Sequence, residues 1–343
     1  MTVKKTVLTM LETHRAQDIS GEQMAQELGV SRAAVWKAIN SLKAQGYPIS
    51  ATTNRGYRLE PRSDLLSAEG IRPHVLPQLQ DRDIFVFETI DSTNLEAKRR
   101  AMLGGGHFTA VIADQQTLGR GRFGRSFFSP PGCGIYLSLL LKPTPQQLSD
   151  ATLLTTAAAV AVCRAIETLT PHHPQIKWVN DIYLNGKKLC GILTEAVTDL
   201  ESGAIESVVI GIGINFRQPE AALPEEVAAV AGTLFGAAAP SVSRNRLVAA
   251  IINELFLLWN GLPDRAFLAD YRSRSMLIGR EIVYARGNEK FAATAEAIDD
   301  DGALIVRMPS GEQAVLRSGE VSVRPADAAS TLPFAGGREA SAQ

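Results

Sequence analysis

The chain has 343 residues, of which 45% are hydrophobic and 21% are charged. This length predicts two or three domains at roughly 100–200 residues each, and the composition excludes a chain that is disordered throughout. The 35 Lys and Arg residues nearly balance 36 Asp and Glu residues, which argues against a protein that is basic throughout. The first 60 residues nevertheless hold eight basic and five acidic residues, a weak asymmetry typical of a nucleic-acid-binding end.

The cysteines and the apolar segments bear on the cellular compartment. Cys133, Cys163 and Cys190 lie far apart without CxxC spacing, so neither a disulfide framework nor a zinc site is predicted. The first ten residues lack the continuous apolar stretch of a secretion signal. The most apolar stretch, residues 151–166, is shorter than the ~20 residues that span a bilayer, so we expect a buried helix. These features predict a cytoplasmic protein with no membrane partner.

Two helix-start signals lie close together near the N-terminus. Ser20 stands three positions before Gln23, as in a capping box, which predicts a helix that begins near Gly21 and ends at Gly29. Ser31 is predicted to cap a second helix. Val35, Ile39 and Leu42 form a single apolar stripe along that second helix.

The opposite face of the second helix carries Arg32, Trp36, Lys37 and Asn40. Two extended runs follow at residues 47–52 and 56–59, joined by a turn at 53–55. Two helices joined by a glycine turn and followed by a hairpin describe a winged helix-turn-helix, whose second helix fits the major groove of DNA. Arg55 at the wing tip suits a phosphate or minor-groove contact. The alternative is a solvated helix pair in a protein-interaction module.

A second compositional regime begins near residue 82, after a linker at residues 61–64. We expect strands at residues 84–88 and 108–114. Between them a helix at residues 91–103, capped by Asp91 or Ser92, ends in three glycines.

Residues 119–125 are Gly-Arg-Gly-Arg-Phe-Gly-Arg and contain the G-x-G-x-x-G pattern of dinucleotide-binding loops. That interpretation fails because prolines at 130 and 131 break any following helix, and residues 125–149 contain no Asp or Glu to bind a ribose. Guanidinium groups pair instead with phosphate and carboxylate oxygens. The segment therefore predicts an anion-binding loop, with a basic surface turn as the alternative.

Two later segments add candidate ligand contacts. Lys177 precedes Trp178-Val179-Asn180-Asp181 and a hairpin whose turn is Asn185-Gly186. A lysine in such a strand neutralises a carboxylate or phosphate if it faces a pocket, although a lone strand lysine is more often a surface charge. Gly211 and Gly213 leave one strand face bare, which indicates either a close ligand or tight sheet packing.

Together these motifs resemble bacterial biotin protein ligases. The resemblance rests on Ser92-Thr93-Asn94, Gln116, Gly119-Arg120-Gly121-Arg122, Lys177-Trp178, Asn180-Asp181, Lys188-Leu189, Gly191-Ile192-Leu193 and Gly211-Ile212-Gly213-Ile214-Asn215. With the winged helix in front, the chain is similar to the bifunctional members, which are both ligases and repressors of the biotin operon.

The resemblance implies an α+β chain in three parts and a tail. Residues 1–62 are expected to form a winged helix-turn-helix domain and residues 63–272 a catalytic α/β domain of the biotin/lipoate ligase type. Residues 273–325, which alternate with period two in runs at 281–286, 291–297, 303–308 and 314–324, are expected to form an SH3-like β-barrel. The small, polar residues 326–343 are expected to be disordered.

The resemblance also implies a two-step reaction. The carboxylate of biotin attacks the α-phosphate of ATP to give biotinyl-5′-AMP and pyrophosphate, and a lysine of the biotin carboxyl carrier protein of acetyl-CoA carboxylase then takes the biotinyl group. Mg²⁺ is expected to arrive with ATP, and no metal-binding residue is assigned. Loaded with biotinyl-AMP, the protein is expected to form a homodimer on operator DNA.

The family pattern assigns roles to individual residues. The predicted biotin-binding residues are Ser92, Thr93, Asn94, Gln116, Arg120, Gly121, Arg122 and Lys177. Lys177 and Arg122 are also the predicted catalytic residues, which hold reactants in line and neutralise developing charge. Lys188 and Asn215 are placed near the nucleotide. The predicted DNA-binding residues are Arg32, Trp36, Lys37, Asn40 and Arg55.

Three positions depart from the family pattern: Val179 replaces a common proline, Phe123 a polar or basic residue, and Cys190 an alanine. Two other functions stay open. One is a lipoate–protein ligase with the same catalytic fold, against which the Gly-Arg-Gly-Arg segment and the winged helix argue. The other is a ligand-sensing transcription factor with an inactive ligase domain, against which the intact Gln116, Arg122 and Lys177 argue.

Overall fold

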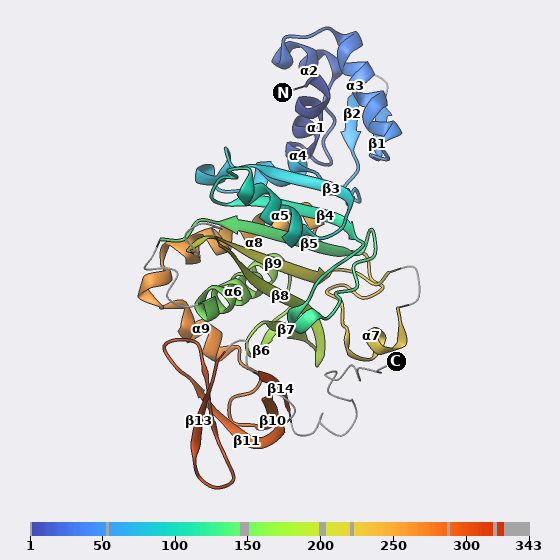
Figure 1. The fold of residues 1–343 in the computed structure, drawn as a ribbon. Helices are drawn as coiled ribbons and strands as arrows, with labels where there is room; N and C mark the ends of the chain where they lie inside the picture. The colour runs from blue at the N-terminus through green and yellow to red at the C-terminus, as the bar shows by residue number, and fades with distance from the viewer. Residues whose placement is uncertain are drawn as a thin grey trace, which may run out of the picture.

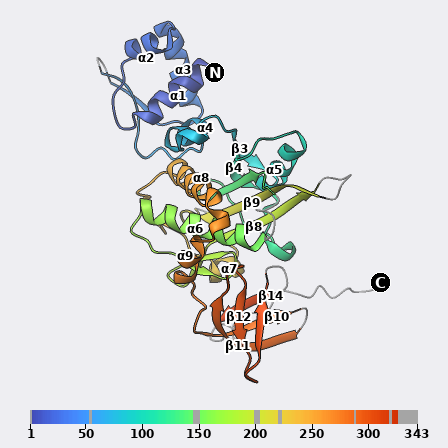
Figure 2. The same ribbon diagram turned by 90° about the vertical axis from the view of Figure 1, so that its left-hand side faces the viewer.

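The computed structural model describes residues 2–52, 55–144, 151–198, 204–219, 223–286, 289–317 and 321–325. Three tiers follow one another along the molecule: an N-terminal helical domain, a central sheet with helices on its faces, and a C-terminal sheet (Figures 1 and 2). This architecture confirms the predicted α+β class. The predicted tail at residues 326–343 and most of the predicted turn at residues 53–55 lie outside the described residues.

The N-terminal tier is a winged helix-turn-helix. Its elements are α1 (Val3–Thr13), α2 (Gly21–Leu28), α3 (Arg32–Ala44), β1 (Ile49–Thr52) and β2 (Gly56–Leu59). Both predicted caps are confirmed, because the hydroxyls of Ser20 and Ser31 accept from the backbone N–H groups of Gln23 and Ala34. The second half of the capping box is wrong, since the Gln23 amide donates to Glu27.

Helix α1 was not among the predicted elements. It begins without a side-chain cap, so the local start signal that identified α2 and α3 is missing. Its apolar residues Val7, Leu8 and Leu11 are nonetheless buried against the stripe of α3. This periodicity was the available signal for the helix.

The wing is held against the start of α2. Ile19 and Tyr57 exchange two backbone hydrogen bonds of 2.9 and 2.8 Å, and Arg58 donates to both carboxylate oxygens of Asp18. Gly56 has φ +110°, and a Cβ there would lie 2.1 Å from the Ile19 carbonyl oxygen. Glycine is therefore required where the wing meets the helices.

The central tier is a seven-stranded sheet in the order β3-β4-β5-β9-β8-β7-β6. Among its described strand pairs, β3 and β4 are parallel and the others are antiparallel. The strands are β3 (Ile84–Ile90), β4 (Thr109–Gln116), β5 (Gly134–Leu141), β6 (Gln175–Lys177), β7 (Asp181–Leu184), β8 (Lys187–Thr198) and β9 (Ile205–Asn215). Helix α5 (Thr93–Met102) covers one face. Helices α6 (Ala151–Leu169) and α8 (Arg244–Asn260) cover the other face. The shorter helices are α4 (Ala68–Ile71), α7 (Glu225–Val230) and α9 (Phe267–Ser273).

Helix α6 confirms the predicted buried helix. By length and composition the segment Thr152–Leu169 resembles a membrane span, but 78% of it is buried inside the protein. It packs against α8, α9 and the sheet, so it is a core helix.

A predicted turn and a predicted helix cap have different outcomes. The Asn185-Gly186 hairpin is confirmed: the two residues have φ of 52° and 75° and join β7 to β8, as a type I′ turn requires. Neither predicted cap of α5 is confirmed, because the Ser92 side chain makes no capping bond and the Asp91 carboxylate accepts from the N–H of Ser92.

The C-terminal tier is an antiparallel sheet in the order β13-β12-β11-β10-β14. The strands are β10 (Glu281–Arg286), β11 (Glu289–Ile298), β12 (Leu304–Arg307), β13 (Gln313–Leu316) and β14 (Val321–Pro325). The predicted single run at 314–324 is wrong, since it contains two strands that lie at opposite edges of this sheet. The SH3-like barrel stays a prediction, because the described strand pairs do not join those edges.

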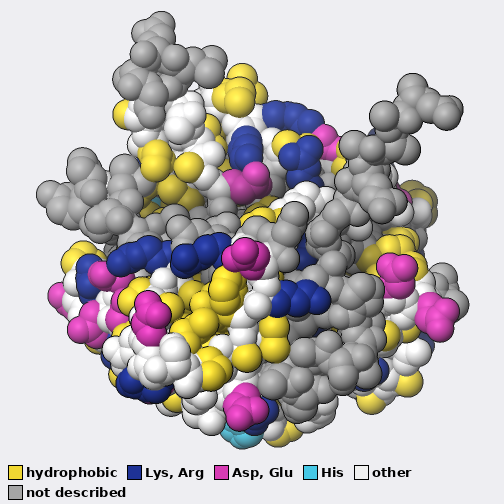
Figure 3. All heavy atoms as spheres, turned by 60° about the horizontal axis from the view of Figure 1, so that its bottom comes forward, with side chains coloured by type: hydrophobic (Ala, Val, Ile, Leu, Met, Phe, Trp, Pro, Cys, Tyr) yellow, Lys and Arg dark blue, Asp and Glu magenta, His cyan; other side chains and the backbone are white. Residues whose placement is uncertain are grey.

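The surface at this end of the molecule mixes charges of both signs. Lys and Arg side chains lie close to Asp and Glu side chains over much of the face in Figure 3. Ion pairs in the C-terminal part of the chain include Arg307–Glu296 and Arg265–Asp301. The described side chains of this face therefore carry charges of both signs.

One buried arginine fixes the linker that follows the winged helix to the central tier. Arg244, only 3% exposed, donates to the carboxylate of Asp64, which follows the winged helix, and to the carboxylate of Asp114 on β4. It also donates to the carbonyl oxygens of Asp64 and Gly134. One guanidinium thus satisfies acceptors from three separate segments.

Substituting Arg244→Met should lower the free energy of unfolding by about 3 kcal/mol, because two carboxylates would lose their buried cation. Chemical denaturation followed by fluorescence measures the change. Arg265→Met is the matched control: its ion pair with Asp301 is exposed and should contribute less than about 1 kcal/mol. Equal losses in the two variants would contradict the importance of burial.

Candidate functional site

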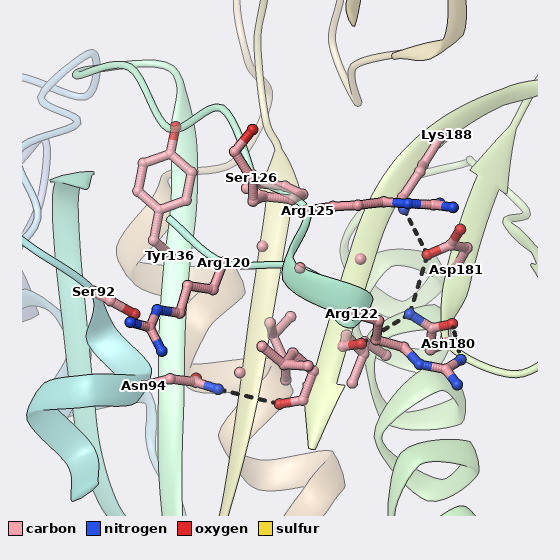
Figure 4. A pocket seen from close by; sticks show the side chains of 18 of the residues that line it. Ser92, Asn94, Arg120, Arg122, Arg125, Ser126, Tyr136, Asn180, Asp181 and Lys188 are labelled. Carbon is pink, nitrogen blue, oxygen red and sulfur yellow. Dashed lines mark hydrogen bonds and ion pairs between the residues drawn. The ribbon is translucent and has the colours of Figure 1, made fainter. Parts of the chain in front are cut away.

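One pocket in the central tier contains all the residues predicted to bind biotin. Its lining includes Ser92, Thr93, Asn94, Gln116, Arg120, Gly121, Arg122, Lys177 and also Lys188. Figure 4 shows Ser92, Asn94 and Arg120 on one side of this pocket and Asn180, Asp181 and Lys188 on the other. Strands, a helix start and the arginine-rich loop thus bring together side chains that are almost a hundred positions apart in sequence.

The pocket floor is a network of neutral polar groups. The Gln116 Oε1 atom accepts from the backbone N–H and the hydroxyl of Thr93, at 2.9 and 3.1 Å, while its Nε2 donates to the Ser129 hydroxyl. The Ser138 hydroxyl lies 2.8 Å from the Thr93 hydroxyl and 2.6 Å from Asn94 Oδ1. These groups hold one another in fixed orientations, so the floor is preorganised.

The bare face of β9 allows this floor to form. A Cβ on Gly211 would lie 2.1 Å from Asn94 Oδ1, and a Cβ on Gly213 would lie 2.7 Å from the Phe127 ring. Both neighbouring side chains also line the pocket. The structure shows tight packing at both glycines, and the side chains that pack there line the pocket. A close ligand, the other explanation, stays a prediction, since Gly211 and Gly213 also line the pocket.

The arginine-rich loop folds back on itself beside the floor. Gly121 N–H donates to the Arg125 carbonyl at 2.7 Å, and Phe127 N–H donates to the Gly119 carbonyl at 2.9 Å. Arg122 donates to Asn180 Oδ1 at 3.0 Å, and its burial lowers the pKa of the guanidinium. The loop is thereby tied to the segment that follows β6.

Phe123 is the departure from the family pattern that this loop exposes. Phe123 is 57% exposed and has a positive backbone φ of 57°. The Arg122 guanidinium lies 4.9 Å from the centroid of the Phe123 ring. An aromatic ring at this distance stabilises a cation through its π face. The substitution removes a charge but adds a contact to Arg122.

The remaining wall carries paired charges. Lys188 Nζ lies 2.6 Å from the Asp181 carboxylate, and the Asn180 amide donates to Asp181 and to the Ile192 carbonyl. Lys177 Nζ lies 5.7 Å from the centroid of the Tyr183 ring. The Trp178–Val179 peptide bond, next along the chain, is cis.

The charge of the pocket is strongly asymmetric. Five cationic side chains line it, namely Arg120, Arg122, Arg125, Lys177 and Lys188. Among the described lining residues, Asp181 is the single acidic side chain. Such a surplus of guanidinium and ammonium groups suits a ligand with carboxylate or phosphate oxygens.

Asn215 is not brought into this pocket. Its amide donates to the carbonyl oxygens of Lys188 and Gly232, and the residue lines a smaller neighbouring cavity with Arg217 and Val227. Tyr136 lines both cavities, so the two are neighbours.

Several lining residues were missed from the sequence. Arg125 and Asn180-Asp181 stood in the motifs and were left without roles, whereas Phe127 and Tyr136 had no local signal. Phe127 reaches the pocket only because Gly213 leaves room for its ring, which is a contact between distant segments.

The predicted DNA-binding residues lie on α3 and on the wing. Arg32, Trp36 and Lys37 are exposed on α3, and Asn40 is half-buried there. Trp36 is 61% exposed, which is a high exposed fraction for a tryptophan, since this residue type is mostly buried in folded proteins. Arg55 is exposed at the wing.

Comparison with known families agrees with this division into tiers. Residues 86–215 match the biotin/lipoate A/B protein ligase family, residues 3–58 match an HTH domain, and residues 277–324 match the biotin protein ligase C-terminal domain. Each of the three matches falls within one tier of the fold.

Individual relatives match over nearly the whole chain. The bifunctional ligase/repressor BirA of Bacillus spizizenii is 34% identical over 90% of this chain and 95% of its own length. The protein of the same description from Escherichia coli is 33% identical over 90% of this chain and 94% of its own length. The Aquifex aeolicus biotin protein ligase, solved in complex with biotin and ATP, superposes with a TM-score of 0.61 at 27% identity and covers 71% of this chain and 99% of its own. The chain belongs to the biotin protein ligase family, in its bifunctional ligase/repressor branch.

Proposed function

We propose that this protein joins biotin to ATP to form biotinyl-5′-AMP and then transfers biotin to a lysine of the biotin carboxyl carrier protein of acetyl-CoA carboxylase. The observation that carries the proposal is the pocket, with a neutral polar floor at one end and five cations around it. A ring with few charges fits the floor, and a carboxylate beside a triphosphate fits the cations. The related Aquifex aeolicus ligase binds both biotin and ATP.

In the first step a biotin carboxylate oxygen forms a bond to the α-phosphorus of ATP, and the bond to the β-phosphate oxygen breaks to release pyrophosphate. Negative charge increases on the transferring phosphoryl group. Lys177 and Arg122 neutralise that charge, with Lys188 near the nucleotide, and Arg120 and Gly121 hold biotin from the loop. Preorganised cations of this kind stabilise a transition state without any protein nucleophile.

In the second step the ε-amine of the acceptor lysine attacks the acyl carbon of biotinyl-5′-AMP. The amide bond forms, the bond to the phosphate oxygen breaks, and AMP leaves as the amine loses a proton. Ser92, Thr93, Asn94 and Gln116 hold the biotin ring at the floor throughout. Their mutual hydrogen bonds keep the acyl carbon at a constant position relative to the loop.

Mg²⁺ enters this proposal bound to the phosphates of ATP, where it neutralises charge, because it retains several waters and few protein ligands. Among the described residues, no group of three or more His, Cys, Asp or Glu side chains is arranged to hold a metal ion. We therefore assign it no residue. The three cysteines are free and buried, which suits the cytoplasmic location that we propose.

We further propose that the protein represses the biotin operon as a homodimer when it holds biotinyl-AMP. The exposed face of α3 supplies Arg32, Lys37 and Asn40 for base edges and Trp36 for apolar contact, while Arg55 contacts the backbone. One winged helix offers few basic groups, so a dimer that doubles the phosphate contacts would bind more tightly and with a steeper salt dependence.

The test that decides between the candidate functions is pyrophosphate release by the purified protein with ATP and either biotin or lipoate. We expect release with biotin and little with lipoate. Release with lipoate alone would identify a lipoate–protein ligase, and no release with either acid would identify a sensor with an inactive ligase domain.

Replacing Lys177 by alanine should reduce biotin-dependent pyrophosphate release by roughly a hundredfold or more, because a cation that stabilises the transition state is lost. Labelling of the carrier domain should fall in parallel. Lys142→Ala, which removes an exposed lysine outside the pocket, is the control and should keep full activity. Circular dichroism verifies the fold, and full activity of a folded Lys177→Ala protein would refute the assignment.

The operator duplex for this test is selected from a random library with the wild-type protein and biotinyl-AMP. Replacing Lys37 by alanine should weaken binding to this duplex by roughly 1–3 kcal/mol if Lys37 contacts a base edge. Fluorescence anisotropy measures the affinity. Adenylation activity should stay unchanged, because Lys37 lies on α3, away from the pocket. Unchanged operator affinity would exclude Lys37 from the DNA interface.

A further inference from the structure

A carboxylate outside the pocket controls one of the groups on its floor. Glu195 lies on β8, on the face that α5 covers, and does not line the pocket. One carboxylate oxygen accepts from Asn94 Nδ2 at 2.7 Å, and the other accepts from Lys98 Nζ at 2.6 Å. Asn94 itself lines the pocket and is only 4% exposed. Glu195 therefore connects the half-buried Lys98 with the floor.

The chemistry of this contact dictates how the Asn94 carboxamide is turned. An ionised carboxylate only accepts hydrogen bonds, so it takes the NH₂ end of an amide and repels the oxygen end. On the other side, the Ser138 hydroxyl lies 2.6 Å from Asn94 Oδ1. Reversing the amide would place two oxygens against each other at Glu195. The orientation with Oδ1 away from Glu195 is thus strongly preferred.

The surroundings keep Glu195 charged. Burial alone would raise the pKa of its carboxyl, but the hydrogen bonds from Lys98 and Asn94 and the charge of Arg120 outweigh burial, and the pKa lies below its ordinary value. The Glu195 carboxylate is therefore ionised at neutral pH. The orientation of the Asn94 amide with Nδ2 toward Glu195 is thus favoured at neutral pH.

Strand β9 prevents Asn94 from escaping this constraint. A Cβ on Gly211 would lie 2.1 Å from Oδ1 and 2.8 Å from Cγ of Asn94, so the carboxamide lies directly on the glycine backbone. Asn94 Nδ2 also donates to the Leu193 carbonyl at 3.3 Å. The carboxamide is thus confined between β8 and β9, with its acceptor oxygen in a set direction.

We propose that Glu195, paired with Lys98, is a positioning residue for ligand recognition: it holds Asn94 so that Oδ1 serves as a hydrogen-bond acceptor for an N–H group of the ligand ring. The inference rests on the proposed function, since biotin carries a cyclic urea with two N–H groups. An acid whose ring lacks N–H groups, such as lipoate, would leave this buried acceptor with less than its full set of partners. Unsatisfied buried acceptors discriminate strongly between such ligands.

The first experiment measures biotin-dependent pyrophosphate release by Glu195→Gln. A neutral amide at 195 is able to face either end of the Asn94 amide, so the preferred orientation is lost. We expect KM for biotin to rise roughly tenfold or more, while kcat and KM for ATP stay within about threefold. Glu206→Gln, which changes an exposed carboxylate on neighbouring β9, is the control and should leave KM for biotin unchanged.

The second experiment exchanges the two partners. Asn94→Asp alone places two carboxylates together and should raise KM for biotin more than Glu195→Gln does. In the double variant Asn94→Asp with Glu195→Gln, the amide at 195 donates to the carboxylate at 94, whose free oxygen again accepts from the ligand. KM should then fall below that of Asn94→Asp.

The outcomes separate this inference from the proposed function. If the wild-type protein fails to adenylate biotin, the proposed function is wrong. If it adenylates biotin and folded Glu195→Gln has a wild-type KM for biotin, the positioning role is wrong. The positioning role would also be wrong if Glu195→Gln, Asn94→Asp and the double variant all lost kcat equally with an unchanged KM for biotin. It would likewise be wrong if the KM for biotin did not recover in the double variant.

Discussion

The functional site depends on a strand face without side chains. Strand β9 lies inside the sheet and pairs with both β5 and β8. Its Gly211 and Gly213 lie on the face of the strand that lines the pocket. A Cβ on Gly211 would overlap Asn94, and a Cβ on Gly213 would overlap Phe127. Only glycine at these two positions leaves room for the two side chains. The floor network, the aromatic wall and the constraint on the Asn94 carboxamide all follow from this absence.

The pocket separates two kinds of recognition. Its floor consists of amides and hydroxyls that are hydrogen-bonded to one another, which gives directional contacts for a neutral ring. Its loop and far wall consist of guanidinium and ammonium groups, which attract anionic oxygens from any direction. The contact between Arg122 and Asn180 joins the loop to the segment that carries Asp181, so cationic side chains line the pocket from both the loop and the opposite wall.

Signals confined to a few neighbouring residues predicted much of this structure. The caps at Ser20 and Ser31, the Asn185-Gly186 turn and the arginine-rich loop each depend on local chemistry, and the structure contains all four features. Contacts between distant segments left no such signal: Phe127 needs the space beside Gly213, and Glu195 acts on a residue 101 positions away. The predicted single run at residues 314–324 combined β13 and β14 for a similar reason: period-two alternation indicates a strand but does not encode its position in a sheet.

A chain that combines a DNA-binding domain and an enzyme needs a defined joint, and here the joint has two unequal sides. On the ligase side Arg244 satisfies Asp64 and Asp114, and Asp114 lies two residues before Gln116 of the pocket floor. On the winged-helix side Glu12 Oε1, Arg15 Nη2 and Ser63 Oγ are buried without a hydrogen-bond partner, and burial raises the pKa of Glu12. Buried polar groups without partners are costly. On that side Arg15 still donates to the Glu12 carboxylate and to the Ser63 carbonyl, so only part of its hydrogen-bonding capacity is unused, while the Arg244 contacts keep residue 64 fixed to the strand that carries Gln116.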